Sequence, residues 1–397
     1  MTLWIGLAVS VAMLLVVAQR SLYVAMFAAA ISLGLITLSP GEFLHQVYLT
    51  FTDPSILSLG LVVATIAMIG GTLEESGGMK RLVENLRIGK RPFLAFSPAL
   101  LGMLPMPGGA LLSAPMVEQG GSELESSTKA VLNVWFRHIL FFIYPLATSL
   151  IASAKIAGLE VYDVVPYLFP FFVLSFVVGY YFFLRSTSEK LTYEREFSLR
   201  GLLVPLAVIL VAPALDFLIK TFINPEVSEY ATLVGVATSF AAAWAVSKYT
   251  LDDFKMVARK MEPWNFALII FGMFTFLNVF IASGAPELLA KINMPLWGLL
   301  VGIGFVLGLI TGRIQAPASI VIPIFLARTS YSVMPAASFA VAYFSIFLGY
   351  VISPIHPCVS VSMEYFDTSL RQYVRKLALP TILCLIVAVL AAIFWIR

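Results

Sequence analysis

Residues 307–323 read LGLITGRIQAPASIVIP, an apolar stretch that Gly312 and Arg313 interrupt near its centre. The apolar segment around it, residues 295–327, is long enough to enter a bilayer, which takes roughly 17–25 mostly apolar residues per helix. Glycine and a charged side chain in the middle favour a turn over a continuous helix. We therefore expect 295–327 to be a hairpin that enters and leaves the membrane on the same side.

A matching stretch lies in the first half of the chain. Residues 101–115 read LGMLPMPGGALLSAP, and Pro107, Gly108 and Gly109 interrupt the apolar segment 92–118. Aligning the two interrupted segments also aligns Ser76-Gly77 with Ser283-Gly284. The alignment predicts an internal repeat, with a re-entrant hairpin in each copy.

The composition is that of a membrane protein. Of 397 residues, 60% are apolar and 12% are charged, and the mean hydropathy is +0.95, whereas about a quarter of the residues in soluble domains are charged. The net charge is only +3, and the basic residues lie in short connecting segments, which excludes a nucleic-acid footprint. The expected surroundings are therefore a lipid bilayer.

Ten further segments are long and apolar enough to cross the bilayer. They are residues 3–18, 21–38, 55–73, 129–152, 161–184, 200–219, 230–248, 264–282, 335–361 and 377–396. The predicted fold is an all-α polytopic membrane protein of two inverted repeats, each with five transmembrane helices, one re-entrant hairpin and one broken helix. The repeats are residues 1–197 and 198–397. Because five crossings are an odd number, the second copy is inverted relative to the first.

Basic residues support this topology, because they accumulate in short cytoplasmic loops. With re-entrant hairpins and an outside N-terminus, the cytoplasmic side collects 18 of the 25 basic residues: Arg20, Lys80, Arg81, Arg87, Lys90, Arg91, Lys129, Arg185, Lys190, Arg195, Arg200, Lys248, Lys255, Arg259, Lys260, Arg371, Arg375 and Lys376. Five lie outside: Lys155, Lys220, Lys291, Arg328 and Arg397. We expect a multi-pass protein of the inner or plasma membrane with both termini outside.

The fourth and ninth spans, 129–152 and 335–361, each contain a proline, Pro145 and Pro357, that aligns with the other. Proline removes an N–H and frees a carbonyl, which a membrane tolerates only beside protein or a water-filled cavity. The hairpin tips add free N–H groups at the starts of half-helices. Interruptions at matching positions of two repeats indicate a transporter's binding site.

The substrate site is predicted at these interruptions. It comprises Pro107, Gly108 and Gly109 at the first tip, Arg313 and Gln315 at the second, His356 and Tyr144 at the two breaks, and Arg137 on the fourth span. An arginine costs roughly 2.5–3.5 kcal/mol inside a membrane, so Arg313 is a functional candidate, and its planar fork suits a carboxylate. Alternatively, Arg313 holds the hairpin through backbone carbonyls, and Arg137 serves as a structural anchor.

The coupling ion is Na⁺ or H⁺. Carboxylates are scarce at membrane depth, so a proton would use His356, while Na⁺ would use carbonyls and hydroxyls. The hydroxyl candidates are Ser113, Thr148, Ser319 and Ser353. The two cysteines, Cys358 and Cys384, lie in apolar stretches and are assigned to packing, with neither a disulfide nor a thiolate metal site.

These features predict a secondary active transporter of a small organic anion. Enzyme motifs such as His-Glu-x-x-His, Gly-x-Ser-x-Gly and the phosphate loop are missing from the sequence, so no catalytic residue and no cofactor are assigned. The alternatives are a cation/proton antiporter, a channel and an intramembrane enzyme.

The chain resembles the ion transporter superfamily, which contains divalent anion/sodium symporters, citrate carriers, the arsenite permease and membrane subunits of tripartite transporters. The resemblance is carried by residues 104–109 (LPMPGG), 312–317 (GRIQAP) and 353–357 (SPIHP). Within the superfamily the chain is most similar to an uncharacterised family of integral membrane proteins. The resemblance implies a scaffold, a mobile transport domain, an elevator-type movement and a homodimer formed through the scaffold.

The sequence departs from the symporters at the hairpin tips. Their Ser-Asn-Thr signature is replaced here by Pro107-Gly108-Gly109 and by Arg313-Ile314-Gln315. Neither their sodium sites nor their dicarboxylate specificity therefore carries over to this chain.

Overall fold

The computed structural model describes residues 1–106, 108–187, 193 and 196–396, and its regular structure is helical throughout. The first half contains α1 (Thr2–Val17), α2 (Leu22–Thr37), α3 (Pro40–Thr52), α4 (Pro54–Glu75), α5 (Gly78–Glu84), α6 (Lys90–Gly102), α7 (Gly109–Gly120), α8 (Ser126–Ile139), η1 (Leu140–Phe142), α9 (Thr148–Ile156), α10 (Val161–Gly179) and η2 (Tyr180–Leu184). Seven helices of the described residues are long and apolar enough to cross a membrane. The all-α polytopic fold class is confirmed.

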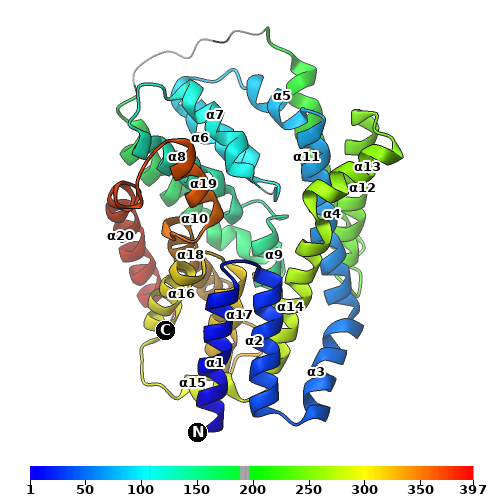
Figure 1. Ribbon diagram of the computed structural model, residues 1–397, viewed down its shortest axis with the longest axis vertical. Helices are drawn as coiled ribbons and strands as arrows, with labels where there is room; N and C mark the ends of the chain where they lie inside the picture. The colour runs from blue at the N-terminus through cyan, green and yellow to red at the C-terminus, as the bar shows by residue number, and fades with distance from the viewer. Residues whose placement is uncertain (107, 188–192, 194–195, 397) are drawn as a thin grey trace.

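The second half of the chain is also built of helices. It contains α11 (Leu199–Phe222), α12 (Glu229–Ser247), α13 (Leu251–Met261), α14 (Pro263–Ala282), α15 (Ala285–Ala290), η3 (Gly298–Ile303), α16 (Gly304–Thr311), α17 (Gln315–Thr329), α18 (Ala336–Ile352), α19 (Pro357–Tyr365) and α20 (Leu370–Trp395). In Figure 1, α5 and α13 lie near the upper end of the molecule, whereas α15 and α3 lie near the lower end. Corresponding helices thus lie at opposite ends, as an inverted repeat requires. The repeat and its boundary at residue 197 stay predictions.

Each segment expected to form a hairpin consists of two short helices joined by a turn. The helices α6 and α7 contain 13 and 12 residues, and α17 contains 15. At about 1.5 Å per residue, such helices are shorter than the ~30 Å hydrocarbon core. In the structure the two hairpins run from Lys90 to Gly120 and from Gly298 to Thr329, within a few residues of the expected bounds 92–118 and 295–327. That each hairpin enters and leaves the membrane on the same side remains a prediction.

The two broken helices are interrupted where the prolines predict. The first consists of α8 and α9, separated by η1 and a turn, and the second of α18 and α19, separated by residues 353–356. Both extend beyond the expected ranges 129–152 and 335–361. The chain therefore leaves helical geometry at both predicted positions.

Two helices, α3 and α13, were not expected from the sequence. Each begins with a capping box, in which the N-cap side chain and the residue three positions later bond each other's backbone N–H. The pairs are Ser39 with Glu42 and Thr250 with Asp253. Hydropathy alone does not detect such helices, because they are too polar to resemble a span.

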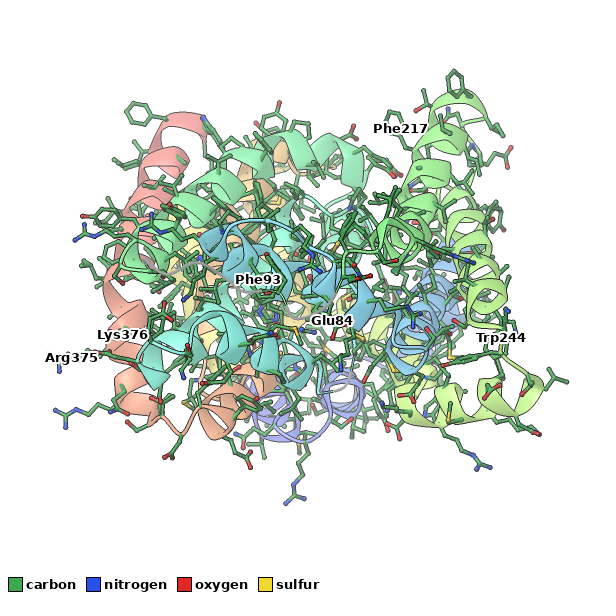
Figure 2. All side chains as sticks on the ribbon, turned by 90° about the horizontal axis from the view of Figure 1, so that it is seen from above. Glu84, Phe93, Phe217, Trp244, Arg375 and Lys376 are labelled. Carbon is green, nitrogen blue, oxygen red and sulfur yellow. The ribbon has the colours of Figure 1, made fainter. Side chains whose placement is uncertain are left out.

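The helices form two layers. In the frame layer, which we define as α1–α4 and α11–α14, α2 and α4 pack against α14, and α4 packs against α12. In the hairpin layer, α6–α10 and η3–α20, each hairpin packs against a broken helix, α6 against α8 and α16 against α18. Figure 2 shows Arg375 and Lys376 of α20 on one side of the molecule and Phe217 and Trp244 of the frame layer on the other.

Polar side chains join the two layers beside α11. The Tyr162 hydroxyl donates to Asp216 Oδ2 at 2.8 Å, and Lys155 pairs with Glu229 at 2.9 Å. Asp216 is only 2% exposed and also accepts from the Thr232 hydroxyl at 2.8 Å. The sequence analysis did not single out this buried carboxylate. Its partners satisfy it structurally, as buried charges require.

The hairpins approach the broken helices through glycine. A Cβ on Gly102 would overlap the carbonyl oxygen of Arg137 in α8, and one on Gly308 would overlap the carbonyl oxygen of Ile346 in α18. Gly102 and Gly308 are aligned positions of the predicted repeat. Small residues at helix crossings let backbones come close, which is how membrane helices gain packing energy.

Replacing Gly308 with alanine should destabilise the protein, because its Cβ would collide with backbone that cannot rotate away. We expect a loss of about 1–3 kcal/mol, as for other overpacked sites, measured as a lower thermal unfolding temperature in detergent. Gly302→Ala is the matched control, since a Cβ on Gly302 meets no atom within 4 Å. Equal unfolding temperatures for the two variants would contradict the close crossing.

Candidate functional site

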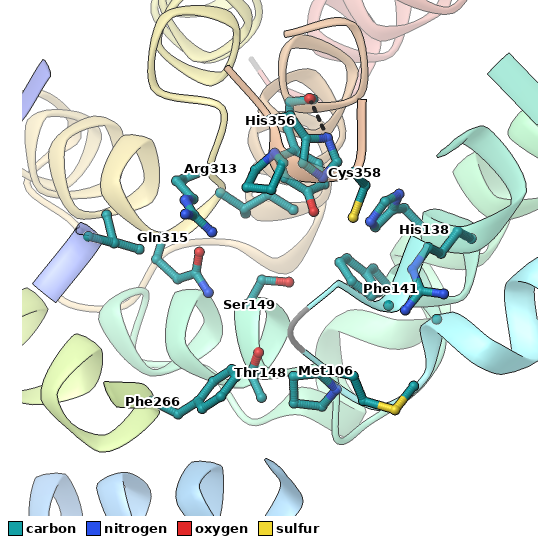
Figure 3. Close-up of a pocket in the computed structure, with 18 of the residues that line it drawn as sticks. Met106, His138, Phe141, Thr148, Ser149, Phe266, Arg313, Gln315, His356 and Cys358 are labelled. Carbon is teal, nitrogen blue, oxygen red and sulfur yellow. Dashed lines mark hydrogen bonds between the residues drawn. The ribbon is translucent and has the colours of Figure 1, made fainter. Parts of the chain in front are cut away.

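A cavity of about 370 Å³ lies between the two layers (Figure 3). Its apolar wall includes frame-layer residues of α2, α4 and α14, such as Leu22, Val63 and Phe266. Its polar groups come from the hairpin layer, where both hairpin tips, α8, the start of α9 and the second break converge. The polar side chains in the lining are Arg137, His138, Thr148, Ser149, Arg313, Gln315, Tyr350, His356 and Cys358.

The first hairpin tip contacts Arg137. Gly108 has a φ of 66°, which favours glycine, and it begins α7. A Cβ on Gly109 would overlap the Arg137 guanidinium, so only glycine lets that group lie against the tip. Arg137 is 4% exposed, and its guanidinium donates to Ser113 Oγ at 3.3 Å. Arg137 therefore both lines the cavity and anchors α7. Pro107 lies outside the described residues, as do Lys190, Arg195 and Arg397.

The second hairpin tip packs against the second break. Gly312 has a φ of 58°, and a Cβ on it would lie 2.9 Å from the backbone nitrogen of His356. Arg313 and Gln315 project from this tip into the cavity, on the opposite side from His138 and Cys358 (Figure 3). Within the described part of the chain, the Arg313 guanidinium has neither a hydrogen bond nor a carboxylate partner. The structure thus offers no bond for the alternative in which Arg313 holds the hairpin.

His356 occupies the end of the second break, immediately before α19. Its ring stacks on Tyr350 with centroids 3.9 Å apart, and its Nδ1 bonds the Tyr350 carbonyl at 3.1 Å. The side chain is 1% exposed, and its Nε2 has no hydrogen-bond partner. The break itself is held by the Ser353 hydroxyl, which donates to the Leu309 carbonyl at 2.6 Å. A buried nitrogen lone pair therefore remains unused beside the cavity.

Tyr144 is placed away from the residues with which the sequence grouped it. Although it occupies the first break, its buried hydroxyl donates to the Ile209 carbonyl in α11 at 3.4 Å. It is not among the described residues that line the cavity. The repeat aligns Tyr144 with His356, but the two side chains face different surroundings.

The four hydroxyls proposed for the coupling ion do not gather at one point. Thr148 lines the cavity at the start of α9. Ser113, Ser319 and Ser353 donate instead to backbone carbonyls of their own half of the chain, at 3.3, 2.8 and 2.6 Å. These three are not among the described cavity-lining residues.

The sequence analysis missed four polar residues of the lining, namely His138, Ser149, Tyr350 and Cys358. Ser149 bonds the Tyr343 hydroxyl at 2.8 Å, and His138 follows Arg137 on α8. Cys358 was assigned to packing; its half-buried side chain packs against the core and also lines the cavity. Its position one residue after Pro357 was the available signal, since a residue beside a helix break faces the space that the break opens.

The charges that line the cavity are positive. Arg137 and Arg313 belong to opposite halves of the chain, and no aspartate or glutamate is present among the described lining residues. Glu74 of α4 also interacts electrostatically with Arg137, but it is paired with Lys260 at 3.1 Å. The arrangement suits an anion, because two guanidinium groups at one cavity attract negative charge.

Two solved structures have a similar fold. One is the YdaH transporter of Alcanivorax borkumensis, with a TM-score of 0.58 and 14% identity over 90% of this chain and 86% of that one. The other is MtrF of Neisseria gonorrhoeae, described with a class of antimetabolite efflux pumps, with a TM-score of 0.55 and 13% identity over 89% and 83% of the two chains. At identities this low, the likeness shows a shared fold alone.

Comparison with curated proteins gives no match. The expectation of an uncharacterised membrane family agrees with the family comparison, whereas membership of the wider ion transporter superfamily stays a prediction. One family model matches residues 3–395, which is nearly the entire chain. The chain belongs to the family described as "Protein of unknown function (DUF401)".

Proposed function

We propose that the protein is a secondary active transporter of a small organic anion that carries a carboxylate or a similar group. The observation that carries this proposal is the pair of arginines, Arg137 and Arg313, which line one cavity from opposite halves of the chain. An arginine inside a membrane is costly, and no carboxylate balances these two among the described lining residues, so an anionic ligand is the explanation that we favour.

The anion is bound by groups that are already in place. Arg313 has free donors in a planar fork, and Gln315 adds an amide from the same tip. The N-termini of α7 and α17 begin at the two tips, so their positive dipole ends add to the attraction. The apolar wall from α2, α4 and α14 accommodates a short carbon skeleton.

Transport follows an elevator-type movement in this proposal. The polar groups of the cavity belong to the hairpin layer and the apolar wall to the frame layer, so a bound anion would travel with the hairpin layer. The frame layer would remain fixed and form a homodimer. A Na⁺ or H⁺ gradient would drive the cycle, and both termini of this cell-membrane protein would lie outside.

The structural neighbours support a transport role. YdaH is described as a transporter and MtrF is described with efflux pumps, and both share the fold over most of their length. Folds host many functions, so this support is by analogy and is weaker than that of the arginine pair.

Arg313→Ala should abolish stabilisation of the purified protein by its anion. We expect the affinity to fall by roughly 10- to 100-fold, the equivalent of about 1.5–3 kcal/mol for lost charge-assisted hydrogen bonds. A thermal-shift screen of mono- and dicarboxylates, with and without Na⁺, identifies the ligand first, because a ligand of the native state raises its stability. Arg328→Ala is the matched control, since Arg328 lies on α17 outside the cavity. Unchanged affinity in Arg313→Ala would contradict the proposal.

If Arg137 also contacts the anion, Arg137→Lys should lower the affinity for dicarboxylates more than the affinity for monocarboxylates of equal length. Lysine keeps the charge but loses the fork, so the second carboxylate loses its paired hydrogen bonds. Isothermal titration of both anion classes measures the difference. An identical loss for both classes would assign Arg137 to anchoring alone.

Proteoliposomes should accumulate the anion only when a Na⁺ or a proton gradient is imposed. The two gradients are applied separately, with ionophores that collapse each of them as controls. Uptake that stops at equal concentrations on both sides under either gradient would contradict coupled transport. His356→Gln distinguishes proton coupling from sodium coupling. A proton-coupled carrier should lose gradient-driven uptake in this variant and keep anion exchange.

A further inference from the structure

Three soft ligand groups meet at one side of the cavity. His138 of α8, His356 of the second break and Cys358 of α19 each present one ligand atom, and these atoms lie within 4.8 Å of one another. Figure 3 shows His138 and Cys358 side by side, with His356 on the same side of the cavity. They come from opposite halves of the sequence, so the cluster exists only in the folded protein.

Both imidazoles bond a backbone carbonyl through Nδ1. His138 Nδ1 lies 2.7 Å from the Val134 carbonyl and His356 Nδ1 lies 3.1 Å from the Tyr350 carbonyl, so each Nδ1 carries the hydrogen. Nε2 of each ring is therefore the atom with the free lone pair. A backbone carbonyl that accepts from the distal nitrogen is the usual orienting partner of a metal-bound histidine.

The buried Nε2 of His356 has no hydrogen-bond partner. An unsatisfied polar atom in a protein interior costs about 1–3 kcal/mol, so such atoms are rare unless a ligand uses them. The Cys358 sulfur is likewise a free thiol. The unpartnered nitrogen is an observation independent of the spacing of the three groups, and a bound metal ion would satisfy it.

We propose that His138, His356 and Cys358 form a binding site for one late first-row transition-metal ion of the Zn²⁺ class. Two imidazoles and a thiolate suit such an ion and do not suit Na⁺, Mg²⁺ or Ca²⁺, which take oxygen ligands. Ligand atoms about 2.0–2.3 Å from a tetrahedral zinc lie roughly 3.5 Å apart, so shifts of about 1 Å would close the site. The fourth position faces the cavity and is open.

Positive charge surrounds the cluster, because Arg137 and Arg313 line the same cavity. With Arg313 also nearby, an anion or hydroxide is the favoured fourth ligand. This site goes beyond the proposed anion transport, because it requires neither a particular solute nor a gradient.

Metal binding is tested on the purified full-length protein with Co²⁺ and Zn²⁺ as probes, in the absence of any organic anion. We expect one Co²⁺ per chain, with a sulfur-to-cobalt charge-transfer band that Zn²⁺ displaces. Cys358→Ser should abolish the band, and His138→Gln and His356→Gln should each weaken Zn²⁺ binding by more than the roughly tenfold typical of second-shell changes. Cys384→Ser and His45→Ala are matched controls, because these residues lie in α20 and α3, outside the cluster.

Protection of Cys358 from alkylation is a second measurement, for use where a variant folds poorly. In the Cys384→Ser background, Zn²⁺ should protect Cys358 from alkylation, and this protection should vanish when either histidine is replaced by glutamine. A charge-transfer band that persists in Cys358→Ser, or equal alkylation with and without Zn²⁺, would overturn the proposal. Arg313→Ala should bind Co²⁺ normally while losing the anion, so failure of the metal site is distinguishable from failure of the proposed transport.

Discussion

The structure depends on how the backbone N–H and C=O groups of non-helical residues find hydrogen-bond partners in apolar surroundings. Lipid offers no hydrogen bonds, so each interruption must be covered by protein or must border a cavity. Here the interruptions cover one another, since Gly312 packs on the backbone of His356 and the Ser353 hydroxyl bonds the Leu309 carbonyl. The first tip is likewise covered by the Arg137 guanidinium. This mutual covering draws both halves of the chain to a common centre.

The same constraint gives the cavity a polar lining on one side and an apolar lining on the other. Hairpin tips and helix breaks bring polar groups, and all of them lie in the hairpin layer, whereas uninterrupted helices of the frame layer supply apolar walls. A ligand bound by hydrogen bonds would therefore be held almost entirely by one layer. Polar links such as Tyr162 with Asp216 and Lys155 with Glu229 join that layer to the frame.

Sequence reasoning located most of this centre because it asked where helices must break. Glycine and proline at matching positions predicted both turns and both breaks, and Arg137, Arg313, Gln315 and His356 all line the cavity that results. Tyr144 was grouped with them, but its hydroxyl bonds a frame-layer carbonyl; Cys358 was assigned to packing alone, although it also lines the cavity. For Tyr144 the position at the break was right, but the direction of the side chain depends on tertiary packing.

By itself the sequence determined the all-helical membrane fold, the broken helices and the positions of the turns, because hydropathy and the backbone limits of glycine and proline act locally. Only the tertiary structure decided which side chains meet. His138 and Cys358 are 220 positions apart, and their proximity follows from the packing of α8 against α19. Which side of a broken helix faces the cavity depends on rotation about the helix axis, and that rotation is set by contacts such as those of Gly102 and Gly308 with distant backbone.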